Sequence, residues 1–432
     1  MSLKSSLQKK APRVFGAYHF VWAWLGARLR KHPSKKVFVI GITGTKGKTT
    51  TLELLNAILE AAGKRTALLS SLRMKIGDET QKNQTGNSMP GRGYIQKFLR
   101  DARAAGCGYA LIEVTSQGVA AHRHRFINWN MGVLTNLAPE HIESHGSFEN
   151  YRAAKLEFLK YTLKKSGKIF LNCDDKNFNF FSEALSGANE KLVEVSADEA
   201  WLRDRLAKTS PMRSLADAGG KAASSTNLIF FLSRFNEENV ALAAAVAKEL
   251  GIADRIIEDA IGSFAGVPGR MEFVFGGPYF GIVDYAHTPD SLEAAYRAAR
   301  SLLAKDTARL ICVLGGAGGG RDKWKRPGMG KIAAHYCDEV ILTDEDPYDE
   351  DPQAIIEEVA AGIAQMPYPK PEVFKMLDRR EALAHAIDIM KEGDVVIATG
   401  KGSEDWIHRA RGEKIPWNEK ATMQELLLRK RT

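Results

Sequence analysis

The stretch from Val37 to Leu59, VFVIGITGTKGKTTTLELLNAIL, joins three local patterns that together could bind a phosphate group. An apolar run rich in β-branched residues, typical of a buried strand, is followed by a turn of glycine, threonine and lysine, and then by the spacing of a helix. Backbone amides at the start of a helix, with a lysine beside them, commonly bind the phosphates of a nucleotide. The stretch therefore predicts that the chain binds a nucleoside triphosphate.

The turn departs from the usual phosphate loop, in which a glycine is followed by four residues and then by Gly-Lys-Thr. Counted back from Gly47, the first glycine of that pattern would fall at Ile42. The loop is therefore a tighter variant, in which we expect Lys48 to reach the β- and γ-phosphates and Thr49, the first of the three threonines that follow it, to bind Mg²⁺. Its residues are Gly44, Thr45, Lys46, Gly47, Lys48, Thr49 and Thr50.

Apolar runs alternate with helical patterns over most of the chain. The strands are continuously apolar rather than alternating, which is typical of parallel sheets that helices cover on both faces. The sequence therefore predicts the α/β class. One series of predicted strands lies at residues 37–42, 109–114, 131–136, 168–172 and 228–232, and a second series lies at 280–285, 309–314, 338–343 and 394–399. Helical periodicity is clear at residues 291–305, 353–364 and 380–391.

Two series of strands predict two α/β domains, joined at the glycine- and proline-rich stretch 264–272. We expect a short helical N-terminal extension at residues 1–36, a central phosphate-loop domain with a mostly parallel sheet at 37–267, and a C-terminal Rossmann-like domain at 268–432. The weakly patterned segment 196–225 is expected to be an excursion on the surface.

The composition is that of an ordinary globular protein. With 432 residues, 44% hydrophobic and 26% charged, the chain is long enough for two or three domains. The net charge of +9 suits an anionic substrate, and since no motif that reads RNA or DNA is present, no nucleic-acid partner is expected. No signal peptide is recognisable, which predicts a cytoplasmic protein. Four widely spaced cysteines are interpreted as reduced thiols rather than a metal site: Cys107, Cys173, Cys312 and Cys337.

Residues 15–31, FGAYHFVWAWLGARLRK, are apolar and aromatic and then basic, and they are too few to span a bilayer. One interpretation is a helix that packs on the body of the protein. The other is a helix in weak contact with a membrane surface, with Trp22 and Trp24 at the depth of the headgroups and with Arg28, Arg30 and Lys31 facing acidic lipid. The sequence leaves both open.

The short phosphate loop resembles that of the Mur ligases and of their relative, folylpolyglutamate synthase. The resemblance continues over nearly the whole chain, in the order found in the Mur ligases that add the third residue of the peptidoglycan stem peptide. Since folylpolyglutamate synthase is not expected to carry DYAHTP or GRDKxKRP, the chain is identified as a member of the Mur ligase family. The matching strings are YALIEVTSQG (109–118), VLTNLAPEHIESHGSFENYRAAKLEFLKY (133–161), FNEENVALAAAVA (235–247), VPGRMEFV (267–274), VDYAHTPDSLEAA (283–295), VLGGAGGGRDKWKRPGMG (313–330) and GKGSE (400–404).

The resemblance implies a reaction. Mur ligases move the γ-phosphoryl group of ATP onto a substrate carboxylate, and an incoming amine attacks the resulting acyl phosphate. Lys48, Arg270 and two Mg²⁺ ions would offset the repulsion between the two anions. Thr49 and Glu113 would bind one Mg²⁺, and Glu113 with His141 the other. The alternative for His141 is a loop histidine that stabilises its own turn.

Lys155, in ENYRAAKLEF, would on spacing alone be interpreted as a solvated helix lysine. In the family, the lysine at this place is carbamylated by CO₂, and the carbamate helps to position the second Mg²⁺. A carbamate forms only on a neutral amine, so the resemblance implies that Lys155 is desolvated or flanked by another cation.

The adenine of ATP is expected against the FNEEN turn, where Asn236 and Asn239 would be the donors. Asp284 and His287 of DYAHTP would close over the nucleotide from the C-terminal domain, so that domain closure would gate catalysis. The alternative for these two residues is a strand-end cap followed by a proline turn.

The incoming amino acid is expected to meet Arg321, which would pair with its α-carboxylate, and Gly400 and Glu404, which would hold its far amine. Family members that use meso-diaminopimelate carry Asp-Asn-Pro-Arg, whose arginine clasps the second carboxylate. In this chain the string at that place is Glu345, Asp346, Pro347 and Tyr348. An acidic pocket attracts a distal ammonium, which favours lysine or ornithine. Diaminopimelate stays open because another cation could replace the arginine, and the acids can also form a solvated loop and helix cap.

The acceptor, a UDP-linked muramoyl dipeptide, is expected to contact Asn87, Ser88, Thr115, Ser116 and Arg123. Ala121 falls where the family often has glutamine, so one contact is expected to be missing. Family members carry a uridine-nucleotide-binding domain before the phosphate loop, whereas 36 residues precede Val37 here. We therefore expect that the UDP end is held loosely, by another subunit or not at all, or that the acceptor is unusual, such as a lipid-linked one.

The sequence thus predicts an ATP-dependent ligase of peptidoglycan synthesis. It would add a diamino acid to the D-glutamate carboxylate of UDP-N-acetylmuramoyl-L-alanyl-D-glutamate and release ADP and phosphate. One alternative is the same chemistry on a lipid-linked, pseudomurein-like or polyglutamate-type acceptor. Another is a non-catalytic ATP-binding subunit, against which the complete set of expected catalytic residues argues.

Overall fold

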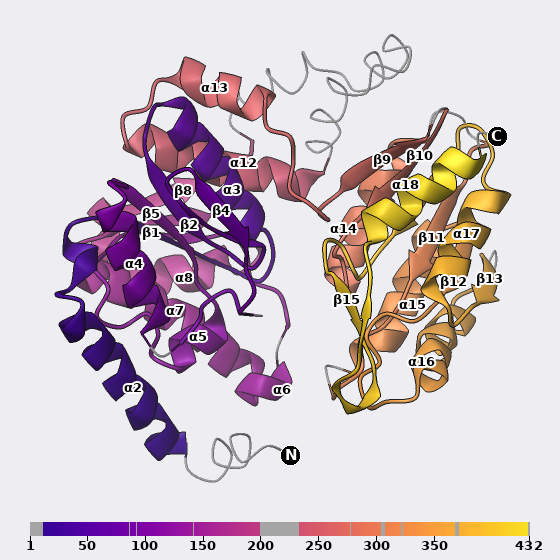
Figure 1. The fold of residues 1–432 in the computed structure, drawn as a ribbon, viewed down its shortest axis with the longest axis horizontal. Coiled ribbons are helices and arrows are strands. Elements are labelled where there is room, and N and C mark those ends of the chain that lie inside the picture. Colours follow the sequence, from indigo (N-terminus) through magenta and orange to yellow (C-terminus); the bar gives the residue numbers. More distant parts are fainter. Residues whose placement is uncertain are drawn as a thin grey trace. The chain divides into compact units, whose positions relative to one another are not determined.

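The computed structural model describes residues 12–85, 87–91, 93–140, 142–198, 233–276, 278–303, 307–320, 323–367 and 371–430. They form two units, each built on its own sheet (Figure 1). The first comprises the described residues up to 198 and residues 237–264, and the second comprises residues 233–236 and 265–430. The domain boundaries expected after residues 36 and 267 stay predictions. The strand expected at 228–232, and the excursion at 196–225 beyond residue 198, lie outside the described residues.

The first unit contains an eight-stranded sheet in the order β4-β3-β2-β5-β1-β6-β7-β8. All of its strands run parallel except β3 and β4, which continue one edge in antiparallel pairs. The strands are β1 Phe38–Thr43, β2 Thr66–Leu69, β3 Arg73–Ile76, β4 Glu79–Lys82, β5 Tyr109–Glu113, β6 Trp129–Leu134, β7 Lys168–Asn172 and β8 Leu192–Val195. The expected mostly parallel sheet is therefore confirmed, with strands at four of the predicted positions.

Helices cover this sheet on both faces, which confirms the α/β class. On one face α4 and α7 bury Phe98 and Phe158 in a shared core, and α3 packs against β1, β2 and β5. The helices are α2 Pro12–Leu29, α3 Lys48–Ala61, α4 Tyr94–Ala104, α5 Ser116–Ala120, α6 Ile142–His145, α7 Phe148–Lys164, α8 Phe178–Leu185, α12 Arg234–Glu249 and α13 Asp254–Gly262, with 3₁₀ turns at Pro33–Lys35 and Ser186–Lys191. In the described part of the chain, no helix has both the length and the apolar character needed to cross a membrane.

The second unit contains a six-stranded sheet in the order β13-β12-β11-β14-β10-β9, parallel except for the edge strand β9. Alternate residues of β11 point into two cores, Leu310 toward α14, α15 and α16, and Ile311 toward α17 and α18. The strands are β9 Glu272–Gly276, β10 Tyr279–Val283, β11 Leu310–Leu314, β12 Glu339–Leu342, β13 Glu372–Lys375 and β14 Val395–Ala398, with a separate pair β15 Trp406–His408 and β16 Lys414–Pro416. The helices are α14 Pro289–Arg300, α15 Lys325–Tyr336, α16 Pro352–Ala364, α17 Arg379–Ile389 and α18 Glu419–Lys430, with a 3₁₀ turn at Ala410–Gly412.

Two of the four cysteines form a disulfide. Cys312 in β11 is bonded to Cys337, which directly follows α15, and their Cα atoms are 6.1 Å apart. The interpretation of four reduced thiols is therefore wrong for this pair, because α15 returns the chain to the sheet beside β11. Cys107 and Cys173 are free thiols, as expected.

Candidate active site

The phosphate loop occupies the four residues between the end of β1 at Thr43 and the start of α3 at Lys48. Gly44 has a φ of 151° and Gly47 a φ of 78°, a backbone region that favours glycine. A Cβ atom on Gly44 would lie 1.8 Å from the hydroxyl oxygen of Thr135, so this position has no room for a side chain. The loop can be shorter than the usual pattern because glycine stands at both bends.

The end of β6 fixes the loop from the side. The backbone amide of Lys46 donates to the Asn136 side-chain oxygen at 2.9 Å, and the amide of Thr45 donates to the Asn136 carbonyl at 3.0 Å. The Thr135 hydroxyl donates to the Lys46 carbonyl at 2.6 Å. Because side chains outside the loop hold its backbone, the loop has a defined shape before any ligand binds.

The two loop lysines have different partners. The ammonium of Lys48 donates to the carbonyls of Gly44 and Thr45, at 3.0 and 2.8 Å, so it lies over the loop where a phosphate is expected. Lys46 instead forms an ion pair with the buried carboxylate of Glu140 at 2.7 Å. Lys48 is thus placed to offer its charge to a ligand, whereas both the charge and the backbone of Lys46 are bonded within the protein.

The structure brings Thr49 and Glu113 together. The Thr49 hydroxyl donates to Glu113 Oε2 at 2.9 Å, because the start of α3 and the end of β5 lie at the same edge of neighbouring parallel strands. Ser71, which the sequence did not single out, contacts both, with its backbone amide 3.0 Å from Glu113 Oε2 and its hydroxyl 3.0 Å from that of Thr49. Hydroxyl and carboxylate oxygens are the donors that Mg²⁺ prefers, so the pair fits the expected ion.

The rest of the expected metal site is only partly described. His141 and Arg321 lie outside the described residues. Among the residues that the structure does describe, no three His, Cys, Asp or Glu side chains form a cluster that could hold a metal ion. The oxygen pair of Thr49 and Glu113 is therefore the observation on which the fit to Mg²⁺ rests.

Lys155 is buried, with 1% of its surface exposed, and is not a solvated helix lysine. Its ammonium donates to the carbonyl of Gly44 at 2.6 Å and lies 4.6 Å from the centre of the Tyr151 ring. Burial and the nearby Lys48 hold the pKa of Lys155 well below its usual value, although Glu140 and Glu113 act in the opposite direction. A lowered pKa gives the amine the neutral form that reacts with CO₂.

Helix α12 borders the other side of the loop. The Thr51 hydroxyl donates to the side-chain oxygen of Asn239 at 3.1 Å, and a Cβ on Gly47 would lie 2.1 Å from that oxygen. Asn236, one turn earlier, is also buried. The two asparagines expected at the adenine thus lie on one helix, α12, and Asn239 contacts the phosphate loop directly.

Three of the expected acceptor residues meet around Met89. Arg123 donates to the Met89 carbonyl at 2.5 Å, and the Asn87 side-chain oxygen accepts from the Met89 amide at 3.0 Å. Ser88, between Asn87 and Met89 in the sequence, is half-buried. Arg123 and the turn at residues 87–91 therefore form one surface.

Thr115 and Ser116 begin the short helix α5. Thr115 caps it, its hydroxyl accepting from the Gly118 amide at 3.1 Å, and the Ser116 hydroxyl lies 3.0 Å from His145 Nε2. Ala121 follows the helix and leaves no amide side chain there. His145, which the sequence argument passed over, joins this side of the site to α7 through its ring contact with Tyr151.

In the second unit, Asp284 is a cap at the end of β10. Its two carboxylate oxygens accept from the amides of Met271 and Ala286, each at 2.7 Å. His287 lies in the following turn, with Nδ1 2.7 Å from the Tyr285 carbonyl. The guanidinium of Arg270 lies 4.2 Å from the centre of the Tyr285 ring. The unit thus brings Arg270, Asp284 and His287 together around Tyr285.

The acids expected to attract a distal ammonium are already paired. Lys401, fully buried, donates to Asp346 at 2.9 Å and to Glu404 at 2.6 Å. Asp344 pairs with Arg409 at 2.7 Å. The alternative of a solvated loop is therefore wrong for Asp344 and Asp346, which are buried and paired with cations distant in sequence, whereas Asp351 does cap α16 as that alternative expected. Binding of a distal ammonium by these acids stays a prediction.

Glu345 differs from its neighbours. It is buried, a Cβ on Gly400 would lie 2.3 Å from its Oε2, and no side chain in the described part of the chain bonds that oxygen. Burial raises the pKa of Glu345 to about 7, with Lys401 and Arg379 acting against the rise. Tyr348, which stands where the family motif has arginine, stacks on His408, with ring centres 5.1 Å apart.

Two models of known protein families match the chain, one for each part of the fold. A model of the Mur ligase middle domain matches residues 42–247, and one of the Mur ligase glutamate ligase domain matches residues 269–402. A UDP-N-acetylmuramoyl-L-alanyl-D-glutamate--2,6-diaminopimelate ligase of Syntrophomonas wolfei is 36% identical, over 94% of this chain and 81% of the relative. A UDP-N-acetylmuramyl-tripeptide synthetase of Deinococcus radiodurans is 34% identical, over 93% of this chain and 80% of the relative.

The fold likeness extends to more distant proteins. A solved folylpolyglutamate synthase of Mycobacterium tuberculosis, complexed with ADP and AMPPCP, superposes with a TM-score of 0.65 at 16% identity, over 88% of this chain and 92% of that chain. The likeness in fold agrees with the sequence matches, which cover both units. The chain therefore belongs to the Mur ligase family, whose members are ATP-dependent ligases that join an acid to an amino acid.

Proposed function

We propose that the protein adds an amino acid to the D-glutamate carboxylate of UDP-N-acetylmuramoyl-L-alanyl-D-glutamate, in peptidoglycan synthesis. One observation carries the proposal: Lys48, Lys155 and the pair of Thr49 with Glu113 converge on a single glycine-bent loop. A positive charge over the loop and an oxygen pair beside it are what phosphoryl transfer from ATP needs. The name of the relative from Syntrophomonas wolfei supplies the acceptor, and the second relative is named for a UDP-N-acetylmuramyl-tripeptide.

The proposed reaction has two steps. A carboxylate oxygen of the acceptor bonds to the γ-phosphorus of ATP as the bond to the β–γ bridging oxygen breaks, which gives an acyl phosphate and ADP. The amine of the amino acid then bonds to the acyl carbon, the carbon–oxygen bond to phosphate breaks, and the amine loses a proton. Lys48 offsets the negative charge that builds up in the first step.

Mg²⁺ fits the oxygens of Thr49 and Glu113, and we propose that these residues and His141 hold two ions, which supply positive charge beside the phosphates. We further propose that CO₂ carbamylates Lys155. Its burial and its low pKa support this, since both favour the neutral amine. The N–H that a carbamate keeps can still donate the hydrogen bond to Gly44.

The amino acid is proposed to be a diamino acid, with diaminopimelate as the first candidate. Pairing of Asp346 and Glu404 with Lys401 removes the electrostatic argument against a second carboxylate. One of the two relatives is named for diaminopimelate. Lysine and ornithine are the alternatives. We propose that Arg321 pairs with the α-carboxylate.

We also propose that the outward face of α2 contacts an anionic lipid surface weakly. Trp22, Trp24 and Leu29 are 39%, 43% and 70% exposed, and the Arg28 guanidinium lies 5.9 Å from the Trp24 ring centre. Aromatic rings beside a cation suit the headgroup layer. Co-sedimentation with phosphatidylglycerol vesicles, but not with phosphatidylcholine vesicles, is expected and should be lost in W22A/W24A; equal binding to both lipids would contradict the role of charge.

The ligase is tested by phosphate release from ATP in the presence of the UDP-muramoyl dipeptide and one amino acid at a time. Diaminopimelate, lysine and ornithine are screened separately, and mass spectrometry identifies the tripeptide product. Release that needs both the acceptor and one diamino acid supports the proposal. The Lys48→Ala variant should be silent. Release that is unaffected by every amino acid would overturn it.

A further inference from the structure

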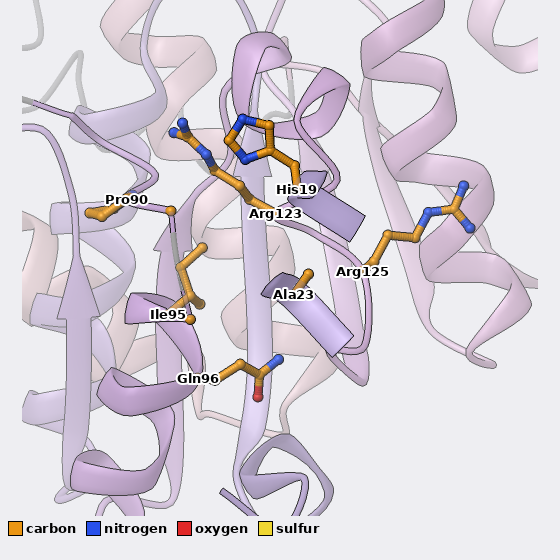
Figure 2. A pocket seen from close by; sticks show the side chains of 9 residues that line it. His19, Ala23, Pro90, Ile95, Gln96, Arg123 and Arg125 are labelled. Atoms are coloured by element: carbon orange, nitrogen blue, oxygen red, sulfur yellow. The ribbon is translucent and has the colours of Figure 1, made fainter. Parts of the chain in front are cut away.

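A cavity lies between α2 and the turn at residues 87–91 (Figure 2). Its open part holds about 210 Å³ and is lined by Tyr18 and His19 of α2, by Thr85 and Asn87, and by Arg123. A smaller pocket beside it shares His19 and Arg123 in its lining and is also lined by Ala23 and Gln96. The cavity is smaller than a pocket for a whole drug-sized ligand, so it suits one group of a larger molecule.

Arg123 gives the cavity its chemistry. Its guanidinium is half-buried and donates to the Met89 carbonyl at 2.5 Å, while its Nε is buried and donates no hydrogen bond within the described residues. No carboxylate in that part of the chain forms an ion pair with it, whereas the neighbouring Arg125 is paired with Glu157 at 2.7 Å. A half-buried guanidinium without a carboxylate partner among the described residues fits a carboxylate or a phosphate.

His19 reaches the same place from α2. It is 7% exposed, and Figure 2 shows its imidazole beside the Arg123 side chain. In the same view Arg125 points away from this pair. An imidazole and a guanidinium side by side supply donors to one oxyanion, and Tyr18 adds an aromatic edge at the mouth of the cavity.

Helix α2 is fixed to the unit by its inner face. A Cβ on Gly26 would lie 2.9 Å from the Cα of Gly93, so the helix approaches the start of α4 as closely as backbones allow. The Phe20 ring packs edge-on against Phe126, with centres 5.0 Å apart. Gly26 lies two turns after His19 on the same side of the helix, so its close approach to Gly93 gives His19 a defined position at the cavity.

We propose that α2 forms one wall of the acceptor site and that His19 and Tyr18 act with Arg123 to hold an oxyanion of the acceptor. This rests on the proposed function, because the acceptor is the one proposed there. Two groups of that molecule have the required chemistry: the diphosphate of the nucleotide and the free carboxylate of the dipeptide.

The test compares three variants of the full-length protein by calorimetric binding of the UDP-muramoyl dipeptide without ATP, and by steady-state kinetics. His19→Gln and Tyr18→Ala should weaken acceptor binding about tenfold, as expected for loss of a bond to a charged group. They should raise the KM for the acceptor and leave kcat and the KM for ATP unchanged. Val21→Ala, on the outward face of α2, should match the wild type.

UDP and the nucleotide-free muramoyl dipeptide are measured in the same way, and the fragment whose binding falls in His19→Gln identifies the oxyanion. A loss confined to UDP assigns the diphosphate, and a loss confined to the dipeptide assigns the carboxylate. Unchanged acceptor binding in both α2 variants would overturn the inference and leave the ligase intact. A wild-type protein that binds no acceptor would overturn the proposed acceptor and the inference with it. Wild-type melting temperatures for the variants exclude misfolding, and His19→Phe repeats the test if His19→Gln unfolds.

Discussion

The ammonium nitrogen of Lys155 lies 2.6 Å from the carbonyl oxygen of Gly44, which is 111 residues away in sequence and is the first residue of the phosphate loop. Helix α7 carries the lysine inward, and the Ser147 hydroxyl fixes where that helix begins by accepting from the Asn150 amide. The contact ties an amine with a lowered pKa to the loop that would hold the nucleotide.

Carbamylation of Lys155 predicts that activity depends on CO₂. Activity should fall when CO₂ is removed from the buffer and return when bicarbonate is added, because a carbamate exchanges with dissolved CO₂. Lys155→Ala should lose about 100-fold in kcat, the upper range for groups that support a metal site. Lys160→Ala, on the exposed side of the same helix, is the control. A ¹³C signal from labelled bicarbonate that is present in the wild type and absent in Lys155→Ala identifies the carbamate; indifference to CO₂ would contradict it.

The contact of Thr49 with Glu113 predicts a shared ion. Glu113→Gln removes the charge and keeps the shape, so the Mg²⁺ concentration for half-maximal ATP turnover should rise about 10- to 100-fold. Thr49→Ser keeps the hydroxyl and should change this Mg²⁺ concentration little. Glu79→Gln, exposed on β4, is the matched control. If Glu113→Gln lowers kcat but leaves the Mg²⁺ dependence unchanged, Glu113 does not bind the ion.

The sequence was informative where the signal is local. Continuous apolar runs predicted β1 and β5, and the resemblance to the Mur ligases paired Thr49 with Glu113, which the structure places at one edge of these two neighbouring parallel strands. The hairpin strand β4 was missed because all of its residues are exposed and it has no apolar pattern.

Partners distant in sequence could not be predicted. Ser71 bonds Glu113 across 42 residues, and no motif marks it. The charge of Asp346 was visible in the sequence, but its neutralisation depends on Lys401, which is 55 residues away and which folding brings against it. The burial of Lys155 is likewise a tertiary property that helical spacing alone predicts wrongly.

The disulfide between Cys312 and Cys337 predicts that reduction destabilises the second unit. Its two cysteines are 25 residues apart, and in the chain-entropy model a cross-link of this span stabilises by about 3 kcal/mol. Unfolding in urea with and without a reducing agent measures the difference. The double variant C312A/C337A should show no response to the reductant, and Cys107→Ala should respond like the wild type. Equal stability of the oxidised and reduced wild-type protein would contradict the prediction.

The raised pKa of Glu345 predicts that the folded protein loses stability as the pH rises. Burial raises its pKa from the usual 4.5 to about 7 in the folded unit, so its contribution to stability is complete below pH 4.5 and is lost as the pH rises through 7. Glu345→Gln stays neutral, so the free energy of unfolding of the wild type, relative to this variant, should fall by about 3 kcal/mol between pH 4.5 and pH 8.5. Urea unfolding at several pH values measures it, with the exposed Glu392→Gln as the control. Parallel pH profiles of wild type and Glu345→Gln would mean that Glu345 is already ionised in the folded protein, and that Lys401 and Arg379 outweigh its burial.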